Sequence, residues 1–299
     1  MFGAVYLSFI NLMSRLSDKL KTRSKLDNKV STKIITKDKL SADDFLIPIA
    51  YGRKHFSEFR YKEAINEFKK SIEIHPNEEA CKLLGITYSH LGQWEESISY
   101  LQKLVELQPN NAHAYNRIGI AYGELGQWEN AMSYFKKCIE LEPNHHLAYL
   151  GLGASHMHFG KYKEAISYYK KTIELNANNV QAYDGLGVAY NFLKQFEEAI
   201  PCFKKAIEIK PDFPDSHRGL GIARIHLNQF EEAIFCLERA IELDPNYALA
   251  YYDLAYAYGC LDKYVKAKKV LLKAKEILQK ETDPELLFKV DKLIEELPY

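Results

Sequence analysis

The chain carries no excess charge and no long apolar run. Lysine and arginine together number 40, and aspartate and glutamate also number 40. A surface without net charge has little general attraction for nucleic acid or acidic lipid, so we expect no nucleic-acid partner. The uncharged stretch MFGAVYLSFINLM at residues 1–13 is too short to cross a bilayer as a helix.

Cysteine is scarce and shows no pairing pattern. There are five cysteines, an odd number, and none belongs to a Cys-x-x-Cys motif. We therefore predict small apolar core residues with free thiols in a reducing compartment, which favours a cytoplasmic location, with peripheral contact at a membrane as the alternative. The cysteines are Cys81, Cys138, Cys202, Cys236 and Cys260.

Motifs of catalysis and cofactor binding are also missing. No nucleophile motif, phosphate-binding loop or carboxylate pair stands apart from the repeating pattern described below. The fragments GLGASH, GLGVAY and GLGIAR follow no predicted strand, so they do not indicate dinucleotide binding. A group of histidines lacks the i, i+4 spacing of a helical metal site. These are His145, His146, His156 and His158. The sequence thus predicts no enzyme activity, no cofactor and no metal.

What the chain does contain is a period of 34 residues. Tyr115 recurs as Tyr149 and Tyr183. The same shift generates a glycine row and an alanine row. They are Gly119, Gly153, Gly187 and Gly221, and Ala131, Ala165, Ala199, Ala233 and Ala267. A constant period in the range of about 20–50 residues indicates a stack of similar units, each packed on its neighbours.

The order of residues within the period resembles the tetratricopeptide repeat family. That pattern is W-x2-L-G-x2-Y, then A-x3-F, then P. The third repeat has at these places Tyr115, Ile118, Gly119, Tyr122, Ala131, Phe135 and Pro143. The resemblance implies an all-α fold, a right-handed α-solenoid of helix–turn–helix repeats. We assign seven repeats, at residues 45–77, 78–111, 112–145, 146–179, 180–213, 214–247 and 248–281.

Glycine and proline give further local predictions. The glycine eight residues into a repeat allows its two helices to approach closely. Pro201 lies within a predicted second helix, where we expect a mild kink. Five first helices are predicted to end in a residue of left-handed conformation. These residues are Gly92, Gly126, Gly160, Lys194 and Asn228.

The two ends of the chain differ from the repeats. Residues 1–24 are apolar and then basic, and several interpretations fit them. They form an amphipathic helix on a membrane surface, or a helix that docks on a partner or a second copy. Otherwise they are a disordered leader, or the start codon is wrongly chosen and Met13 is the true start. Residues 25–44 are predicted as a polar linker. Residues 282–299 are predicted as a helix that caps the last repeat, beginning at Asp283 and Pro284.

The resemblance also implies that first helices line a concave, partner-binding face. The ninth position of successive repeats forms an apolar stripe with polar neighbours, which suits an amphipathic helix or an extended peptide. The expected groove residues are Lys82, Ile86, Asn116, Arg117, Ile120, Leu150, Ala154, Met157, Asp184, Val188, Asn191, Arg218, Ile222, Tyr252 and Tyr256.

Two binding modes known in the family are not indicated. The slots that would grip an acidic chaperone C-terminus hold residues such as Ile49, Leu83 and His113 instead of lysine and asparagine. The asparagine ladder found in O-linked N-acetylglucosamine transferase is also absent from the sixth position. Three central repeats have glycine there, and we expect a shallow floor that a ligand backbone approaches closely. These glycines are Gly151, Gly185 and Gly219.

The sequence therefore favours a non-catalytic interaction scaffold, or adaptor, that holds a peptide or helix of a partner protein in its groove. Two alternatives are kept. One is a self-assembling protein of a membrane or organelle that uses residues 1–24 for membrane contact or self-association. The other is the regulatory arm of an enzyme complex.

Overall fold

The computed structural model describes residues 44–281 and 283–297. Within these ranges every regular element is an α-helix. The predictions for residues 1–24 and for the linker up to residue 43 lie outside the described residues. None of the described helices is both long enough and apolar enough to cross a bilayer.

The helices form pairs, one within each predicted repeat. The first helices are α2 (Leu46–Ser57), α4 (Glu78–His90), α6 (Ala112–Glu124), α8 (His146–His158), α10 (Val180–Phe192), α12 (Pro214–His226) and α14 (Ala248–Cys260). The second helices are α3 (Tyr61–Ile74), α5 (Trp94–Leu107), α7 (Trp128–Leu141), α9 (Tyr162–Leu175), α11 (Phe196–Ile209), α13 (Phe230–Leu243) and α15 (Tyr264–Glu281). A last helix, α16 (Pro284–Glu296), follows them.

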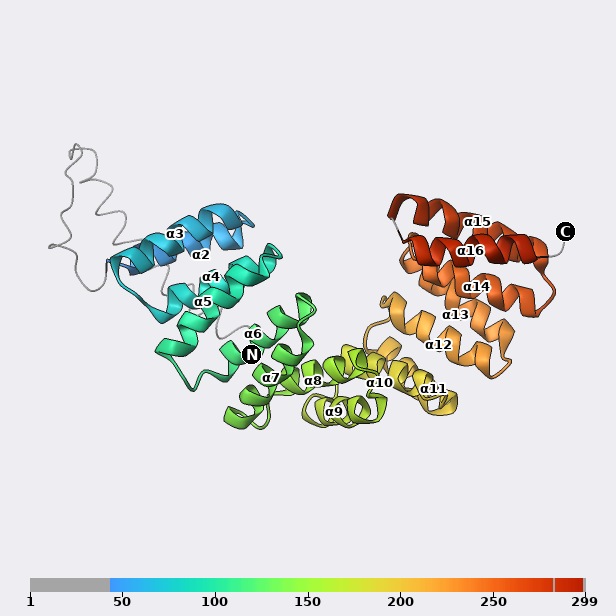
Figure 1. Ribbon diagram of the computed structural model, residues 1–299, viewed down its shortest axis with the longest axis horizontal. Helices are drawn as coiled ribbons and strands as arrows, with labels where there is room; N and C mark the ends of the chain where they lie inside the picture. The colour runs from blue at the N-terminus through green and yellow to red at the C-terminus, as the bar shows by residue number, and fades with distance from the viewer. Residues whose placement is uncertain (1–43, 282, 298–299) are drawn as a thin grey trace.

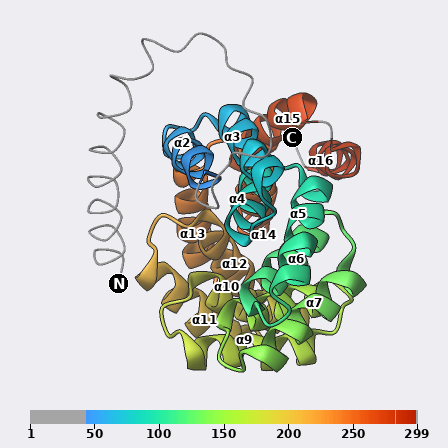
Figure 2. The ribbon, with the colours of Figure 1, turned by 90° about the vertical axis from the view of Figure 1, so that its left-hand side faces the viewer.

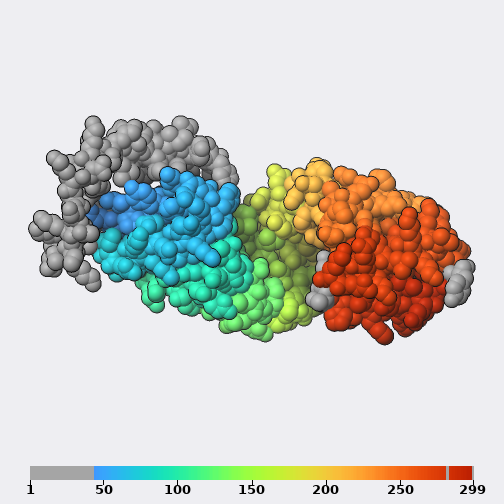
Figure 3. Space-filling view, turned by 90° about the horizontal axis from the view of Figure 1, so that it is seen from above, coloured from blue at the N-terminus to red at the C-terminus, as the bar shows by residue number. Residues whose placement is uncertain are grey.

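The pairs stack into a curved α-solenoid (Figure 1). Successive first helices contact one another, for example α6 with α8 and α10 with α12, whereas successive second helices make no comparable contact. The first helices therefore lie on the inside of the curve, and the second helices lie outside; Figure 2 shows α9 and α11 at the outer edge. Viewed from above, the central repeats lie between the two ends of the arc (Figure 3).

The core of each central repeat is an aromatic side chain held between two glycines. A Cβ atom added to Gly119 would lie 2.7 Å from the Phe135 ring, and one added to Gly151 in the next repeat would lie 2.4 Å from the same ring. Tyr169 and Phe203 are enclosed in the same way. Their glycines are Gly153 and Gly185, and Gly187 and Gly219.

This packing corrects the expectation for the sixth-position glycines. Gly151, Gly185 and Gly219 do not form a floor for a ligand, because an aromatic ring of the preceding second helix already covers each of them. Where that helix carries leucine instead, at Leu101 and Leu237, the next repeat accepts a charged residue in the sixth position. The glycines therefore make room for large core residues.

Local predictions for the helix ends are confirmed. The five residues proposed as left-handed caps have φ between 58° and 71°. They are Gly92, Gly126, Gly160, Lys194 and Asn228.

α11 runs through Pro201 and has 14 residues, the same length as α9 and α13. The five cysteines are free thiols.

The final helix covers the end of the stack. The Asp283 side chain accepts a hydrogen bond from the Leu286 backbone N–H at 3.0 Å, and Pro284 occupies the first turn. Leu286 and Val290 are buried in the same cluster as residues of α15. The predicted apolar face of this helix is thus in contact with the last repeat.

Candidate functional site

The inner face carries a stripe of apolar side chains, one from the ninth position of each repeat after the first. Ile120 is 41% exposed and Tyr256 is 52% exposed. The other four are half-buried: Ile86, Ala154, Val188 and Ile222. This stripe, which we call the inner stripe, runs over α4, α6, α8, α10, α12 and α14. It leaves enough apolar surface in solvent to gain from being covered.

Neighbouring predicted residues contribute unequally to this face. Lys82 is exposed. Leu150 and Met157 are half-buried and pack partly against the cluster around Tyr169. Tyr252 packs in the same manner on the last cluster. These side chains are therefore shared between the core and the inner surface.

The two predicted asparagines have structural roles. Asn116 is only 4% exposed, so its side chain does not reach the surface of the groove. Asn191 donates a hydrogen bond from Nδ2 to the Gly219 carbonyl at 3.1 Å, which joins α10 to α12. The Oδ1 atoms of both side chains are buried without a hydrogen-bond partner. We leave Asn116 out of the proposed binding surface.

Charged groups near the ends of the arc pair with each other. Arg218 donates from Nε to the Asp253 carboxylate at 2.6 Å, and both side chains are less than one quarter exposed. The Arg218 guanidinium also lies over the Tyr247 ring. Arg53 forms a similar pair with Glu79 at 2.5 Å. Such internally satisfied pairs hold adjacent repeats together and offer little to a ligand.

Two charged groups of the central repeats, Arg117 and Asp184, differ from these pairs. Neither forms an ion pair with another described residue. Arg117 is exposed, and desolvation lowers its pKa from the usual value. Asp184 accepts a hydrogen bond from the Ser216 hydroxyl at 2.7 Å. Desolvation raises the pKa of Asp184 to about 6, although the Ser216 hydrogen bond opposes the shift. Arg117 is thus a cation without an ion pair among the described residues, as Lys82 is, and Asp184 is a carboxylate that is costly to ionise.

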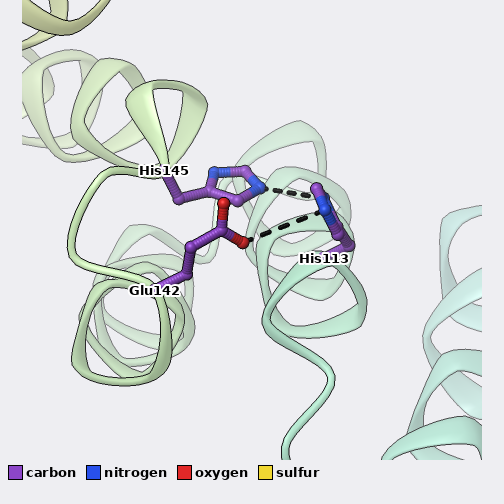
Figure 4. A group of neighbouring side chains, drawn as sticks. All are labelled: His113, Glu142 and His145. Carbon is purple, nitrogen blue, oxygen red and sulfur yellow. Dashed lines mark hydrogen bonds and ion pairs between the residues drawn. The ribbon is translucent and has the colours of Figure 1, made fainter.

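A second cluster lies where the third repeat meets the fourth (Figure 4). It consists of His113 in the first turn of α6, Glu142 just after α7, and His145 just before α8. His145 Nε2 lies 3.1 Å from His113 Nδ1. His113 Nε2 lies 3.9 Å from the Glu142 carboxylate. Two imidazoles and a carboxylate are a ligand set typical of zinc, so the geometry needs a test.

The hydrogen bonds of His145 do not suit a metal. Its Nδ1 atom accepts from the Ala148 backbone N–H at 3.3 Å, which caps α8. A neutral ring that accepts at Nδ1 carries its proton on Nε2, the atom that faces His113. A metal would need the Nε2 lone pair and would turn Nδ1 into a donor, against the Ala148 N–H. We therefore interpret the cluster as a helix cap and an inter-repeat contact.

The spacing of this cluster explains why sequence reasoning missed it. Asn111 and Asn179 occupy the place of His145 in neighbouring repeats and cap their helices by the same hydrogen bond. The second residue and the last residue of one repeat meet at the joint, as Asp215 and Tyr247 also do. Pairing these two positions along the period would have found His113 with His145.

Comparison with known proteins identifies the family. Residues 78–142 and 145–212 match the family model for the tetratricopeptide repeat, and residues 223–261 match a second model described as TPR repeat. Together these ranges cover more than half of the chain. The chain belongs to the tetratricopeptide repeat family. Tetratricopeptide repeat proteins are generally non-catalytic scaffolds that bind protein partners.

Individual relatives of this tetratricopeptide repeat protein are distant. Over 74 residues, 24% of this chain, it is 32% identical to Protein CTR9 homolog of Arabidopsis thaliana, and that stretch spans 7% of the relative. A tetratricopeptide repeat protein from Parabacteroides merdae superposes with a TM-score of 0.67 at 18% identity, covering 82% of this chain and 98% of that one. YrrB, described as having an unusual peptide-binding site, superposes with a TM-score of 0.51 at 24% identity, covering 64% of this chain and 97% of that one. These structures support the fold.

Proposed function

We propose that the inner face of the solenoid binds an extended or helical segment of another protein. The observation that carries this proposal is the inner stripe, a row of partly exposed apolar side chains across six consecutive first helices. Covering apolar surface contributes about 25 cal/mol per Å² to binding. A segment with apolar side chains at regular intervals would bury the whole row, as in other helix or peptide grooves.

Two charged groups of the central repeats, Arg117 and Asp184, define the polarity of such a segment. Arg117 in the third repeat calls for a carboxylate, and Asp184 in the fifth calls for a cation. A partner that supplies both, in the order set by the two repeats, gains two charge-assisted contacts. A reversed segment would place like charges together, which is unfavourable. The proposed ligand is therefore an apolar segment with an acidic residue toward one end and a basic residue toward the other.

A displayed peptide library tests this proposal. Peptides selected by the intact chain should lose binding to a triple variant, Ile120→Asp, Val188→Asp and Ile222→Asp, because each change places a carboxylate in the inner stripe. Val265→Asp is the matched control, since Val265 is 83% exposed on the second helix α15. Circular dichroism should show the same helical content in all three proteins. Selected peptides that bind the triple variant as well as the intact chain would place the binding surface elsewhere.

The Asp184 carboxyl provides a second readout in the same experiment. Its pKa is about 6, so it is largely protonated below that pH and charged above it. Peptides with a cation opposite Asp184 should bind more tightly as the pH rises through about 6. Asp184→Asn should remove this pH dependence. An unchanged pH profile in that variant would show that Asp184 does not contact the cation.

A further inference from the structure

The outer face has a cleft between the second helices α11 and α13, with α12 as its floor. Its volume is about 430 Å³. The walls include Ile207, Leu220, the exposed ring of Phe235, and two cations, Lys204 and Arg224. It lies on the opposite face from the inner stripe, because the second helices lie outside the curve.

Two aromatic residues of the repeat pattern are replaced in the sixth repeat, and both replacements line the cleft. In the second repeat Tyr88 stacks on Tyr100, with ring centroids 5.6 Å apart, and in the third Tyr122 stacks on Tyr134 at 5.3 Å. Arg224 and Cys236 occupy the corresponding positions of the sixth repeat. A flexible guanidinium side chain and a small thiol thus replace two stacked rings at this joint.

The same replacement changes the electrostatics of the joint. Elsewhere a lysine of the preceding second helix lies over the tyrosine ring, as Lys170 does over Tyr190 at 5.8 Å. Lys204 has the place of Lys170 one repeat later, and the residue at the place of the Tyr190 ring is Arg224, which lines the same cleft. Burial raises the pKa of the Cys236 thiol, and Arg224 and Lys204 both oppose that shift. Two cations thus converge on the same cleft around Cys236.

These cations lack partners among the described residues. The Arg224 Nε atom is buried and has no hydrogen-bond partner. Glu231 and Glu232 line the edge of the cleft in the first turn of α13, where the helix dipole favours carboxylates, but neither forms an ion pair with Arg224 or Lys204. His217 is already engaged, because its Nε2 lies 2.9 Å from the Pro211 carbonyl. A buried guanidinium nitrogen without an acceptor is a costly arrangement that an anion would relieve.

We propose that this outer cleft binds the C-terminal residue of a partner protein, with its carboxylate against Arg224 and Lys204 and a large apolar side chain against Ile207, Leu220 and Phe235. A C-terminal residue carries both groups on neighbouring atoms, which matches the mixture of cations and apolar walls. The site is separate from the groove on the inner face and does not depend on it.

Nuclear magnetic resonance with matched peptides tests this site. The probes are acetyl-Gly-Gly-Leu as the free acid and the same peptide as the C-terminal amide. With the 15N-labelled full chain, the free acid should shift the Arg224 Nε–H resonance in a saturable manner, with a Kd of about 1 mM. The amide should bind at least about tenfold more weakly, because it lacks the charge.

Three variants complete the test, read by saturation transfer on the peptide. Arg224→Tyr restores the residue that the pattern has at this place and should abolish binding of the acid. Lys204→Gln should weaken it about tenfold, and Lys170→Gln, the equivalent change one joint earlier, should leave it unchanged. A melting curve checks that Arg224→Tyr is folded. Equal binding of acid and amide, full binding by Arg224→Tyr, or a shift produced by inorganic phosphate but not by the peptide would each overturn the proposal.

Discussion

At the scale of single residues, the aromatic core side chain of a central repeat excludes a β-carbon at the sixth position of the next repeat. Phe135 fills the space above both Gly119 and Gly151, so a β-carbon at either glycine would overlap the ring. Leu101 is smaller and branched, and the following repeat carries Arg117 at the equivalent place. The glycines on either side of each ring, such as Gly119 and Gly151, are therefore coupled to the side chain packed between them.

Substitution of these glycines tests the coupling. Gly151→Ala should lower the free energy of unfolding by about 1–3 kcal/mol through overpacking against Phe135. Gly259→Ala is the control: Gly259 lies within α14 with nothing within 4 Å of an added Cβ, so alanine should stabilise the protein by about 0.5–1 kcal/mol. Urea denaturation measures both effects. Adding Phe135→Leu should reduce the cost of Gly151→Ala, and strictly additive costs would contradict the coupling.

At the scale of helices, the joints between repeats depend on how each first helix begins. Asn77, Asn111 and Asn179 accept the backbone N–H three residues ahead, as N-caps commonly do. His145 performs the same task for α8 with its Nδ1 atom and reaches His113 with the other ring nitrogen. This helix start is thus the one among the four whose capping side chain can take up a proton, and burial lowers the pKa of that side chain.

The cap at His145 predicts a dependence of stability on pH. Desolvation, and secondarily His113, lowers the pKa of His145 in the folded protein. A base whose pKa is lowered by folding contributes its full stability above its unfolded pKa of about 6.5 and loses it as the pH falls through the folded value. His145→Asn keeps a cap acceptor, so the urea midpoint should fall less between about pH 7.5 and about pH 5 than in the natural chain. Identical pH profiles would exclude this role; His156, whose pKa is also lowered, keeps some dependence in both proteins.

The period made most of the fold predictable, and packing across joints made part of the site unpredictable. The left-handed residues and the apolar face of α16 follow from local patterns, so sequence reasoning placed them correctly. The sixth-position glycines were misjudged because the ring that covers Gly151 comes from the preceding repeat. Asn116 was expected on the surface for the same reason. Spacing shows the direction in which a side chain points but not what already lies there.

At the scale of the whole molecule, a stack of repeats has two ends that expose core surface. α16 covers one of them, and it places Leu286 and Val290 in a cluster with Leu271 and Leu278 of α15. Without this cover, the last repeat would present an apolar face of the kind that promotes association.

Two substitutions, one on the buried face of α16 and one on its exposed face, test whether α16 is needed as a cover. Val290 is fully buried, so Val290→Asp should detach the helix, destabilise the last repeat by about 3 kcal/mol and cause self-association. Phe288 is 69% exposed on the same helix, so Phe288→Asp should leave the association state unchanged. Sedimentation velocity distinguishes these outcomes. A monodisperse, fully stable Val290→Asp protein would mean that the end of the stack needs no cover.

Successive second helices approach each other less closely than successive first helices do, and this difference has a mechanical consequence. Cohesion between repeats is concentrated where each first helix meets its neighbours, so the axis about which the arc bends lies near the inner side. A small rotation at every joint then changes the distance between successive second helices far more than it changes the length of the inner stripe. We therefore expect a change of curvature to alter the outer face more than the spacing of the side chains in the inner stripe.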